Sequence, residues 1–368
     1  MSRSKPRVFN FSAGPATLPL PVLQQIESDI VSTADWGVSI LEISHRDPRF
    51  VEILEETKAR LRRLLELPDD IDILFLQGGS RLQFSMVPLN LAGGPEGRAE
   101  YVVTGTWGNH ALAEARRLVE AHSIWDGSET NFDRLPAEAE VAPSPAASYV
   151  HFTSNETIQG VQFPGVPDWN GARLVCDASS DFLSRPWPMD SIDLLYACAQ
   201  KNAGPAGVTI VLIRRARWQD SATDELPSYL RYALHAEGNS LWNTPCTFGI
   251  LAVNLVCRWL EEEMGGLTSL ARRNSEKASM LYDVIDSFPE LYRGHAEAAC
   301  RSKMNVTFRL PDAECEAAFL AGAAERRLVA LKGHRSVGGI RASIYSAMPI
   351  EGVERLAEWM RIFAERSC

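Results

Sequence analysis

Hydrophobic positions along the chain follow two alternating spacings, which predict alternating helices and strands. Residues 50–66 carry apolar side chains at helical spacing, whereas residues 71–76 (IDILFL) form a short apolar run of strand length. More apolar runs occur at 101–105, 149–153, 172–177, 193–199 and 207–213, with helical stretches at 82–91 and 108–120. Short buried strands separated by helices favour a largely parallel sheet that is covered on both faces.

The last third of the chain has a different pattern. It predicts long helices at 247–263 and 267–287, a helix at 312–326, a final helix at 351–365, and strands at 304–310 and 340–345. We therefore expect an α/β protein with a large domain at residues 16–258. A smaller α+β domain follows at 259–368, and residues 1–15 pack on it. Residues 136–148 (PAEAEVAPSPAAS) are expected to form a solvated loop.

Composition and charge exclude several classes of protein. The 368 residues are 45% hydrophobic and 23% charged, as in ordinary globular proteins, and the net charge of −10 argues against a nucleic-acid binder. No apolar run approaches the roughly 20 residues that span a bilayer, and the first ten residues lack the apolar core of a secretory signal. The seven cysteines show no metal-binding spacing. We expect a cytoplasmic protein with reduced thiols, no metal and no membrane association.

Polar residues follow the predicted strands, and two of them suggest covalent chemistry. Lys201, one of six lysines, comes directly after an apolar strand, where loss of water would make it a nucleophile or an imine-forming amine. Asp177 ends another strand 24 residues earlier. Alternatively, Lys201 extends from the strand end into solvent and Asp177 caps a turn. Together, a lysine and an aspartate are what a pyridoxal phosphate site needs.

Other residues at the same predicted edge suit an anionic ligand. Gly78-Gly79-Ser80-Arg81 precedes a helix and offers backbone amides to a phosphate, while Trp107 offers a ring for stacking. Neither nucleotide-binding glycine motif is present. Basic residues in turn-like segments predict anion recognition, with surface salt bridging as the alternative; they are His45, Arg46, His334, Arg335 and Arg341.

Seven segments, in order along nearly the whole chain, closely resemble the phosphoserine aminotransferase family. They are FNFSAGPATLP (9–19), GVSILEISHR (37–46), FLQGGSRLQFSMVPLNL (75–91), TSNETIQG (153–160), AQKNAGPAGVTIV (199–211), NTPCTF (243–248) and KGHRSVGGIRASIYSAMP (332–349). This resemblance implies the fold of the fold-type I pyridoxal-phosphate-dependent transferases, in class V, with pyridoxal 5′-phosphate as cofactor. It also implies a homodimer with shared active sites.

The resemblance further implies a role for each matching residue. Lys201 would form the imine with the cofactor and move the Cα proton, Asp177 would pair with the ring nitrogen, and Trp107 would stack on the ring. The ring hydroxyl would contact Thr157 and Ser179. The cofactor phosphate would be held by Ser80, Arg81 and Gln200, and from the partner subunit by Asn243 and Thr244. Arg341 would bind the α-carboxylate, and the distal anion would be bound by His45, Arg46, His334 and Arg335.

The implied reaction transfers the amino group of L-glutamate to 3-phosphohydroxypyruvate, a phosphorylated 2-oxo acid, in serine biosynthesis. The 4-phosphohydroxy-L-threonine reaction of pyridoxine biosynthesis is a second expectation. Two positions depart from the family pattern: Ala13 stands where some members have Ser, and Cys246 where Pro is usual. A class V enzyme with another anionic substrate therefore stays open as an alternative.

The sequence disfavours three other classes of protein. A cysteine desulfurase needs a reactive cysteine on a mobile loop, but the segment 332–341 has none. A non-catalytic binding homologue would be expected to lack Lys201 or Asp177. A nicotinamide-dependent enzyme would be expected to carry the glycine fingerprint.

Overall fold

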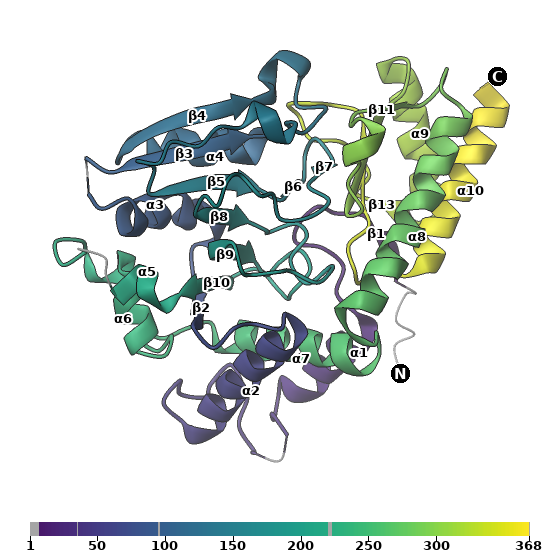
Figure 1. Cartoon of the computed structure of the whole chain (residues 1–368). Helices are drawn as coiled ribbons and strands as arrows, with labels where there is room; N and C mark the ends of the chain where they lie inside the picture. Colours follow the sequence, from purple (N-terminus) through teal and green to yellow (C-terminus); the bar gives the residue numbers. More distant parts are fainter. Residues whose placement is uncertain (1–6, 35, 95, 220–222, 368) are drawn as a thin grey trace.

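The computed structural model describes residues 7–34, 36–94, 96–219 and 223–367. At its centre is a seven-stranded sheet with the strand order β2-β10-β9-β8-β5-β3-β4 (Figure 1). The strands are β2 (Ile71–Leu76), β3 (Arg98–Val103), β4 (Glu120–Asp126), β5 (Tyr149–Thr153), β8 (Leu174–Asp177), β9 (Ile192–Cys198) and β10 (Thr209–Arg214). Strand β10 runs antiparallel to both β2 and β9, and the other neighbouring pairs are parallel. The predicted mostly parallel sheet is confirmed.

Helices cover both faces of this sheet because alternate residues of each strand point to opposite sides. In β2, Phe75 packs in one buried cluster and Leu74 in another. The first cluster receives α2 (Pro48–Leu64) and α7 (Thr247–Glu262), and the second receives α3 (Gly79–Leu91) and α4 (Thr106–Ala115). Strands buried on both faces read as continuous apolar runs, which is the pattern seen in the sequence.

Helix α2 shows how the sequence specifies one of these covering helices. The Asp47 side chain accepts a hydrogen bond from the Arg49 amide, and Pro48 occupies the first turn, so the start of the helix is well defined. The buried residues Phe50, Leu54 and Leu61 recur at helical spacing and face the first cluster. The remaining helices are α1 (Leu20–Asp29), α5 (Arg215–Gln219), α6 (Tyr232–Glu237), α8 (Gly266–Ser287), α9 (Ala313–Glu325) and α10 (Ile350–Ser367).

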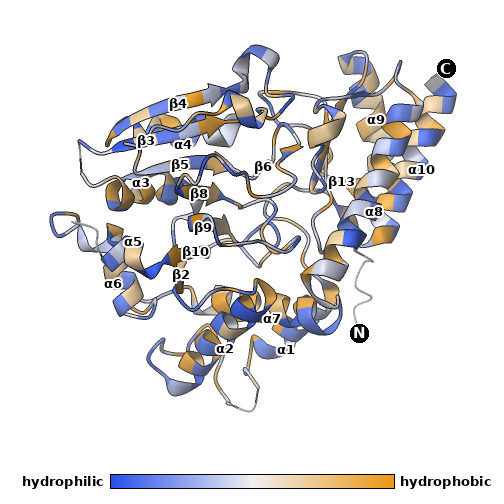
Figure 2. Ribbon diagram, in the orientation of Figure 1, coloured by the Kyte–Doolittle hydropathy of each residue, from blue (hydrophilic) through white to orange (hydrophobic). Residues whose placement is uncertain are grey.

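The C-terminal third forms a layer of its own beside the main sheet (Figure 1). A small antiparallel sheet of β11 (Arg293–Gly294), β12 (Asn305–Arg309) and β14 (Ile340–Ser343) packs with α8, α9 and α10 around a third cluster. Helices α8 and α10 carry hydrophobic and hydrophilic residues side by side (Figure 2). Near the N-terminus, β1 (Phe9–Asn10) pairs with β13 (Leu328–Val329). The proposed domain boundary after residue 258 stays a prediction, since α8 contributes Leu267 to the first cluster and Leu281 to the third.

Two sequence expectations differ from the structure. The helix expected at 108–120 ends at Ala115, and residues 120–126 form the edge strand β4, whose partial burial hides the apolar alternation. The expected solvated loop 136–148 contains a short helical turn at Glu138–Glu140, and Val141 is only 3% exposed because it joins the first cluster. Within the described ranges, we find no helix with the length and apolarity needed to cross a membrane.

A buried lysine ties α8 to the segment that follows β14. The Lys277 ammonium group, 4% exposed, donates to the carbonyl oxygens of Ile344, Tyr345, Ser346 and Met348 at 2.8–3.5 Å. The Ser346 amide in turn donates to the Asn202 side chain, next to Lys201. The anchored segment therefore joins the C-terminal layer to the main sheet.

We predict that Lys277→Met lowers the free energy of unfolding by about 1–3 kcal/mol, because buried carbonyl groups lose their donor. Urea denaturation followed by circular dichroism at one protein concentration measures this change. Lys303→Met is the matched control, since Lys303 is exposed and the same substitution there changes the free energy by less than about 0.5 kcal/mol. Equal stability of the two variants would contradict the prediction.

Candidate active site

A cavity of about 390 Å³ lies where the parallel strands end. Strands that run in the same direction present their carboxyl ends at one edge, so residues far apart in sequence meet there. Ten of the residues singled out in the sequence line this cavity: Ser80, Arg81, Trp107, Thr157, Asp177, Ser179, Gln200, Lys201, His334 and Arg341.

Lys201 follows β9, and its side chain reaches into the cavity. Its ammonium group donates to Thr157 Oγ1 at 2.7 Å and lies 5.7 Å from the centre of the Trp107 ring. Gly14 passes close to this side chain, because a Cβ added there would lie 3.6 Å from Lys201 Cγ. The lysine is thus confined between an aromatic wall and the N-terminal segment and does not extend into solvent.

Asp177 ends β8 and is 3% exposed. One carboxylate oxygen accepts from the Ser179 amide at 3.0 Å. Burial raises the pKa of Asp177, while the hydrogen bond from Ser179 and the charge of Lys201 oppose that increase. The side chain is a buried acid at the cavity wall with a cation nearby.

The N-terminus of α3 supplies an anion site at the end of β2. Gly78 and Gly79 have φ angles of +88° and +64°, a conformation that glycine adopts without strain. Ser80 follows, with its hydroxyl 2.7 Å from Ser179 Oγ and 2.7 Å from Cys198 Sγ. These amide and hydroxyl groups at the start of a 13-residue helix suit a phosphate.

Basic residues surround the open side of the cavity. The Arg81 guanidinium lies 5.5 Å from the centre of the Trp107 ring. Partial burial lowers the pKa of Arg341, and burial together with Arg341 and Arg335 lowers the pKa of His334. These shifts favour the neutral form of His334, while Arg341 provides a cationic charge beside it.

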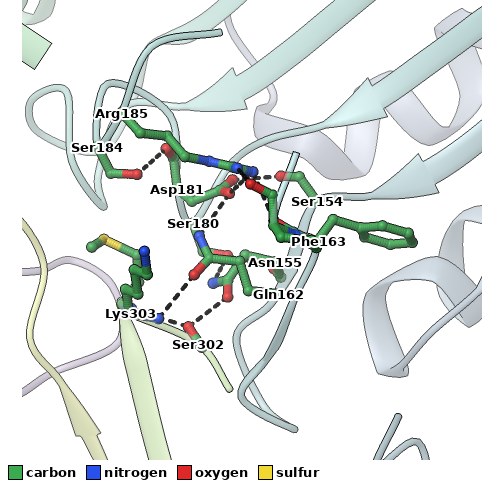
Figure 3. Close-up of polar contacts among 12 residues, drawn as sticks. Ser154, Asn155, Gln162, Phe163, Ser180, Asp181, Ser184, Arg185, Ser302 and Lys303 are labelled. Carbon is green, nitrogen blue, oxygen red and sulfur yellow. Dashed lines mark hydrogen bonds and ion pairs between the residues drawn. The ribbon is translucent and has the colours of Figure 1, made fainter. Parts of the chain in front are cut away.

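A buried polar network supports the wall of the cavity (Figure 3). Asp181 accepts hydrogen bonds from Ser154, from Gln162 at 3.0 Å and from Arg185 at 3.4 Å. Asn155 donates to Ser180 at 2.7 Å and accepts from Ser302 at 2.6 Å. The network connects the loop after Asp177 with the turn that carries Thr157 and with the C-terminal layer.

Five predicted site residues do not line the cavity of this chain: His45, Arg46, Asn243, Thr244 and Arg335. Arg46, Thr244 and Arg335 are exposed, and His45 is 9% exposed on another segment. The Asn243 amide donates to Gln77 Oε1 at 3.2 Å, beside the Gly78 turn. Their assigned roles stay predictions.

The structure also adds residues that the sequence analysis did not assign. Cys198 lines the cavity, and Glu156 is fully buried between Thr157 and the start of α4. Glu156 is the charged residue of the segment TSNETIQG, and that charge was the one sign in the sequence of a special role. Its hydrogen-bond partners, Trp107 and Gly108, lie almost 50 residues away in sequence, so the sequence did not reveal them. Among the described residues, no cluster of three or more His, Cys, Asp or Glu side chains could hold a metal ion.

The residues present fit pyridoxal phosphate. The α3 N-terminus with Ser80 suits the phosphate, Trp107 suits the ring face, Asp177 suits the ring nitrogen, and Lys201 can reach a carbonyl carbon in the cavity.

Comparisons with known proteins agree with this chemistry. The sequence profile of the family aminotransferase class-V matches residues 8–356. The phosphoserine aminotransferase of Rhodopirellula baltica is 51% identical over 98% of this chain and 96% of its own length. The solved phosphoserine aminotransferase of Bacillus circulans subsp. alkalophilus covers 98% of this chain and 99% of its own, with a TM-score of 0.95 and 43% identity. The pyridoxal-phosphate-bound enzyme of Trichomonas vaginalis has a TM-score of 0.91 and 38% identity over 96% of this chain and 100% of its own.

We predict that Lys201→Ala abolishes both amino transfer and the covalent link to the cofactor, because no other amine reaches the cavity from the residues that line it. Borohydride reduction followed by peptide mass spectrometry measures the link. Lys303→Ala serves as the control and retains it, since Lys303 is exposed outside the cavity. A reducible cofactor still attached to the Lys201→Ala protein would show that the lysine is misassigned.

Proposed function

The chain belongs to the aminotransferase class-V family, and from that premise we propose that it is a phosphoserine aminotransferase. Aminotransferases exchange an amino group between an amino acid and an oxo acid, with pyridoxal phosphate as cofactor. In the proposed reaction, L-glutamate and 3-phosphohydroxypyruvate become 2-oxoglutarate and O-phospho-L-serine. The observation that carries the proposal is 51% identity over 98% of the chain to an enzyme of that name, together with a cavity that combines Lys201, Asp177 and basic residues.

Each cavity residue then has a task in the reaction. Bound pyridoxal phosphate supplies an electron-withdrawing ring that stabilises negative charge at the substrate Cα. Lys201 Nζ removes the Cα proton and returns it, as a general base and then a general acid. The Asp177 carboxylate would hold a proton on the pyridine nitrogen. The Trp107 ring would limit the movement of the cofactor ring.

Basic residues at the cavity mouth account for two anionic substrates that use one site. Arg341 can bind the α-carboxylate common to both through paired N–H donors. His334 lines the cavity and Arg335 is the exposed residue that follows it; we assign both to the other end of the substrate, where one substrate has a phosphate and the other a carboxylate. A histidine next to an exposed arginine can serve both anions, because the charge of the histidine adjusts to the ligand.

A second copy of the chain would complete the site. His45, Arg46, Asn243 and Thr244 lie outside the cavity of their own subunit. Large apolar side chains close to them in sequence are exposed: Leu41 at 60% and Trp242 at 48%. Exposed apolar residues next to residues expected to bind an anion support a homodimer in which this surface covers the neighbour's cavity.

We predict that L-phosphoserine converts the yellow holoenzyme to the colourless pyridoxamine form at a much lower concentration than L-serine does. The physical reason is a charge-assisted contact to phosphate, worth about 1.5–3 kcal/mol. Absorption spectroscopy of the half-reaction measures both concentrations.

Arg335→Ala should weaken phosphoserine about tenfold or more and leave serine nearly unchanged. If the wild-type protein reacted with glutamate but not with phosphoserine, the assignment as an aminotransferase would stand and phosphoserine would be rejected as its substrate. Equal losses for both amino acids in the variant would reject the role of Arg335.

We predict that an inactive variant and a variant with weakened phosphate binding restore activity when they are combined and assayed at a phosphoserine concentration too low for the second variant alone. Lys201→Ala and Arg46→Ala, co-expressed in equal amounts, pair at random, and each mixed dimer keeps one site with both residues intact. Activity should then reach about a quarter of the wild-type value. If Arg46 served the cavity of its own chain, no mixed dimer would be active, so an absence of recovery in verified mixed dimers would contradict the shared site.

A further inference from the structure

A single turn contacts both Lys201 and the helix that carries Trp107. This turn joins β6 (Asn155–Glu156) to β7 (Val161–Gln162). Thr157 accepts the hydrogen bond of the Lys201 ammonium group at 2.7 Å. The preceding residue, Glu156, accepts from the Trp107 amide at 3.0 Å and from the Gly108 amide at 2.8 Å. Adjacent residues thus hold two parts of the cavity wall.

Glu156 replaces the side-chain cap that α4 lacks. Gly105 occupies the cap position and has no side chain to satisfy the first amides of the helix. The two oxygens of Glu156 accept one amide each, and Gln159 Oε1 accepts a third, from Thr106 at 3.3 Å. A carboxylate at this end also interacts favourably with the helix dipole. The orientation of the first turn of α4 consequently depends on a residue from the turn after β6.

The fit around Glu156 leaves little freedom. A Cβ added at Gly105 would lie 2.5 Å from Glu156 Cδ, and one at Gly108 would lie 3.4 Å from Glu156 Oε1. The side chain is fully buried. Burial raises the pKa of Glu156 to about 7, and Asp177 adds to that increase, whereas the two amides and Lys201 oppose it. The carboxylate is therefore part of the electrostatic environment of the cavity, although it does not line it.

We propose that Glu156 is a positioning residue that holds the Trp107 ring against the cofactor by capping α4. The inference rests on the proposed function only through its cofactor, because it concerns the ring wall and not the substrate end. Loss of one acceptor would let the first turn of α4 shift, and the Trp107 ring would shift with it. Lys201 and Asp177 would stay in place, since the hydrogen bonds that Thr157 and Ser179 make with them do not involve the Glu156 side chain.

Glu156→Gln tests this role, because an amide keeps the shape but can accept only one of the two backbone donors. We expect the dissociation constant of pyridoxal phosphate for the apoprotein to rise about tenfold, corresponding to about 1.4 kcal/mol. The circular dichroism band of the bound cofactor should weaken as it does in Trp107→Ala. Glu100→Gln is the matched control and should change neither value, since Glu100 is a buried carboxylate that accepts from the Ser144 amide outside the cavity.

A double-mutant cycle separates positioning from a purely structural effect. In a Trp107→Ala background, Glu156→Gln should cause no further loss of cofactor affinity, because the ring that it positions is gone. An equal loss in both backgrounds, or no loss in either, would overturn the proposal. These titrations measure cofactor binding and need no substrate. If phosphoserine failed to react, the proposed function would be rejected, but the role of Glu156 could still be judged from the titrations.

A second variant keeps the test valid if Glu156→Gln does not fold. Gly105→Ala leaves the carboxylate unchanged but places a methyl group against it, and it should reproduce the weaker cofactor binding. Gly165→Ala is its control, because an added Cβ meets nothing within 4 Å there. Wild-type affinity in Gly105→Ala would count against the proposal as well.

Discussion

The placement of two opposite charges in a buried cavity is the constraint on which the rest of the structure depends. Asp177 is the last residue of β8, and Lys201 follows the end of the adjacent strand β9. A buried carboxylate is costly unless hydrogen bonds and a nearby cation stabilise it. The Ser179 amide and Lys201 provide both.

Hydrogen bonds behind the cavity wall hold Lys201, Asp177 and Trp107 in one arrangement. The turn at residues 155–160 holds Lys201 through Thr157 and α4 through Glu156, while Asn155 and Asp181 connect it to the loop after β8 and to the C-terminal layer. Polar groups buried at this depth destabilise the protein unless each finds a partner, so the network favours one geometry over alternatives. Rigid support of this kind keeps reacting groups aligned for catalysis.

The cavity is open toward the basic residues and closed toward the sheet. Lys201, Asp177 and Trp107 come from the buried edge of the sheet, whereas Arg46, Thr244 and Arg335 are exposed. Chemistry common to all substrates thus depends on the rigid part of one chain. Under the proposed function, recognition of different anions would fall to solvent-facing residues and, in the proposed dimer, to the neighbouring subunit.

The sequence by itself determined the type of most elements, and it proposed Lys201 and Asp177 as the reacting residues, which the structure places in one cavity. Apolar runs that end in Lys201 and Asp177 predicted both the parallel sheet and its functional edge, because strand burial and strand direction leave a direct pattern in the sequence. Edge strand β4 escaped that pattern because it is only partly buried. Tertiary structure alone decided that Glu156 caps α4 and that Cys198 meets Ser80, since these contacts join residues 48 and 118 positions apart. No local spacing records such contacts; they arise only when the strands have aligned and their ends converge.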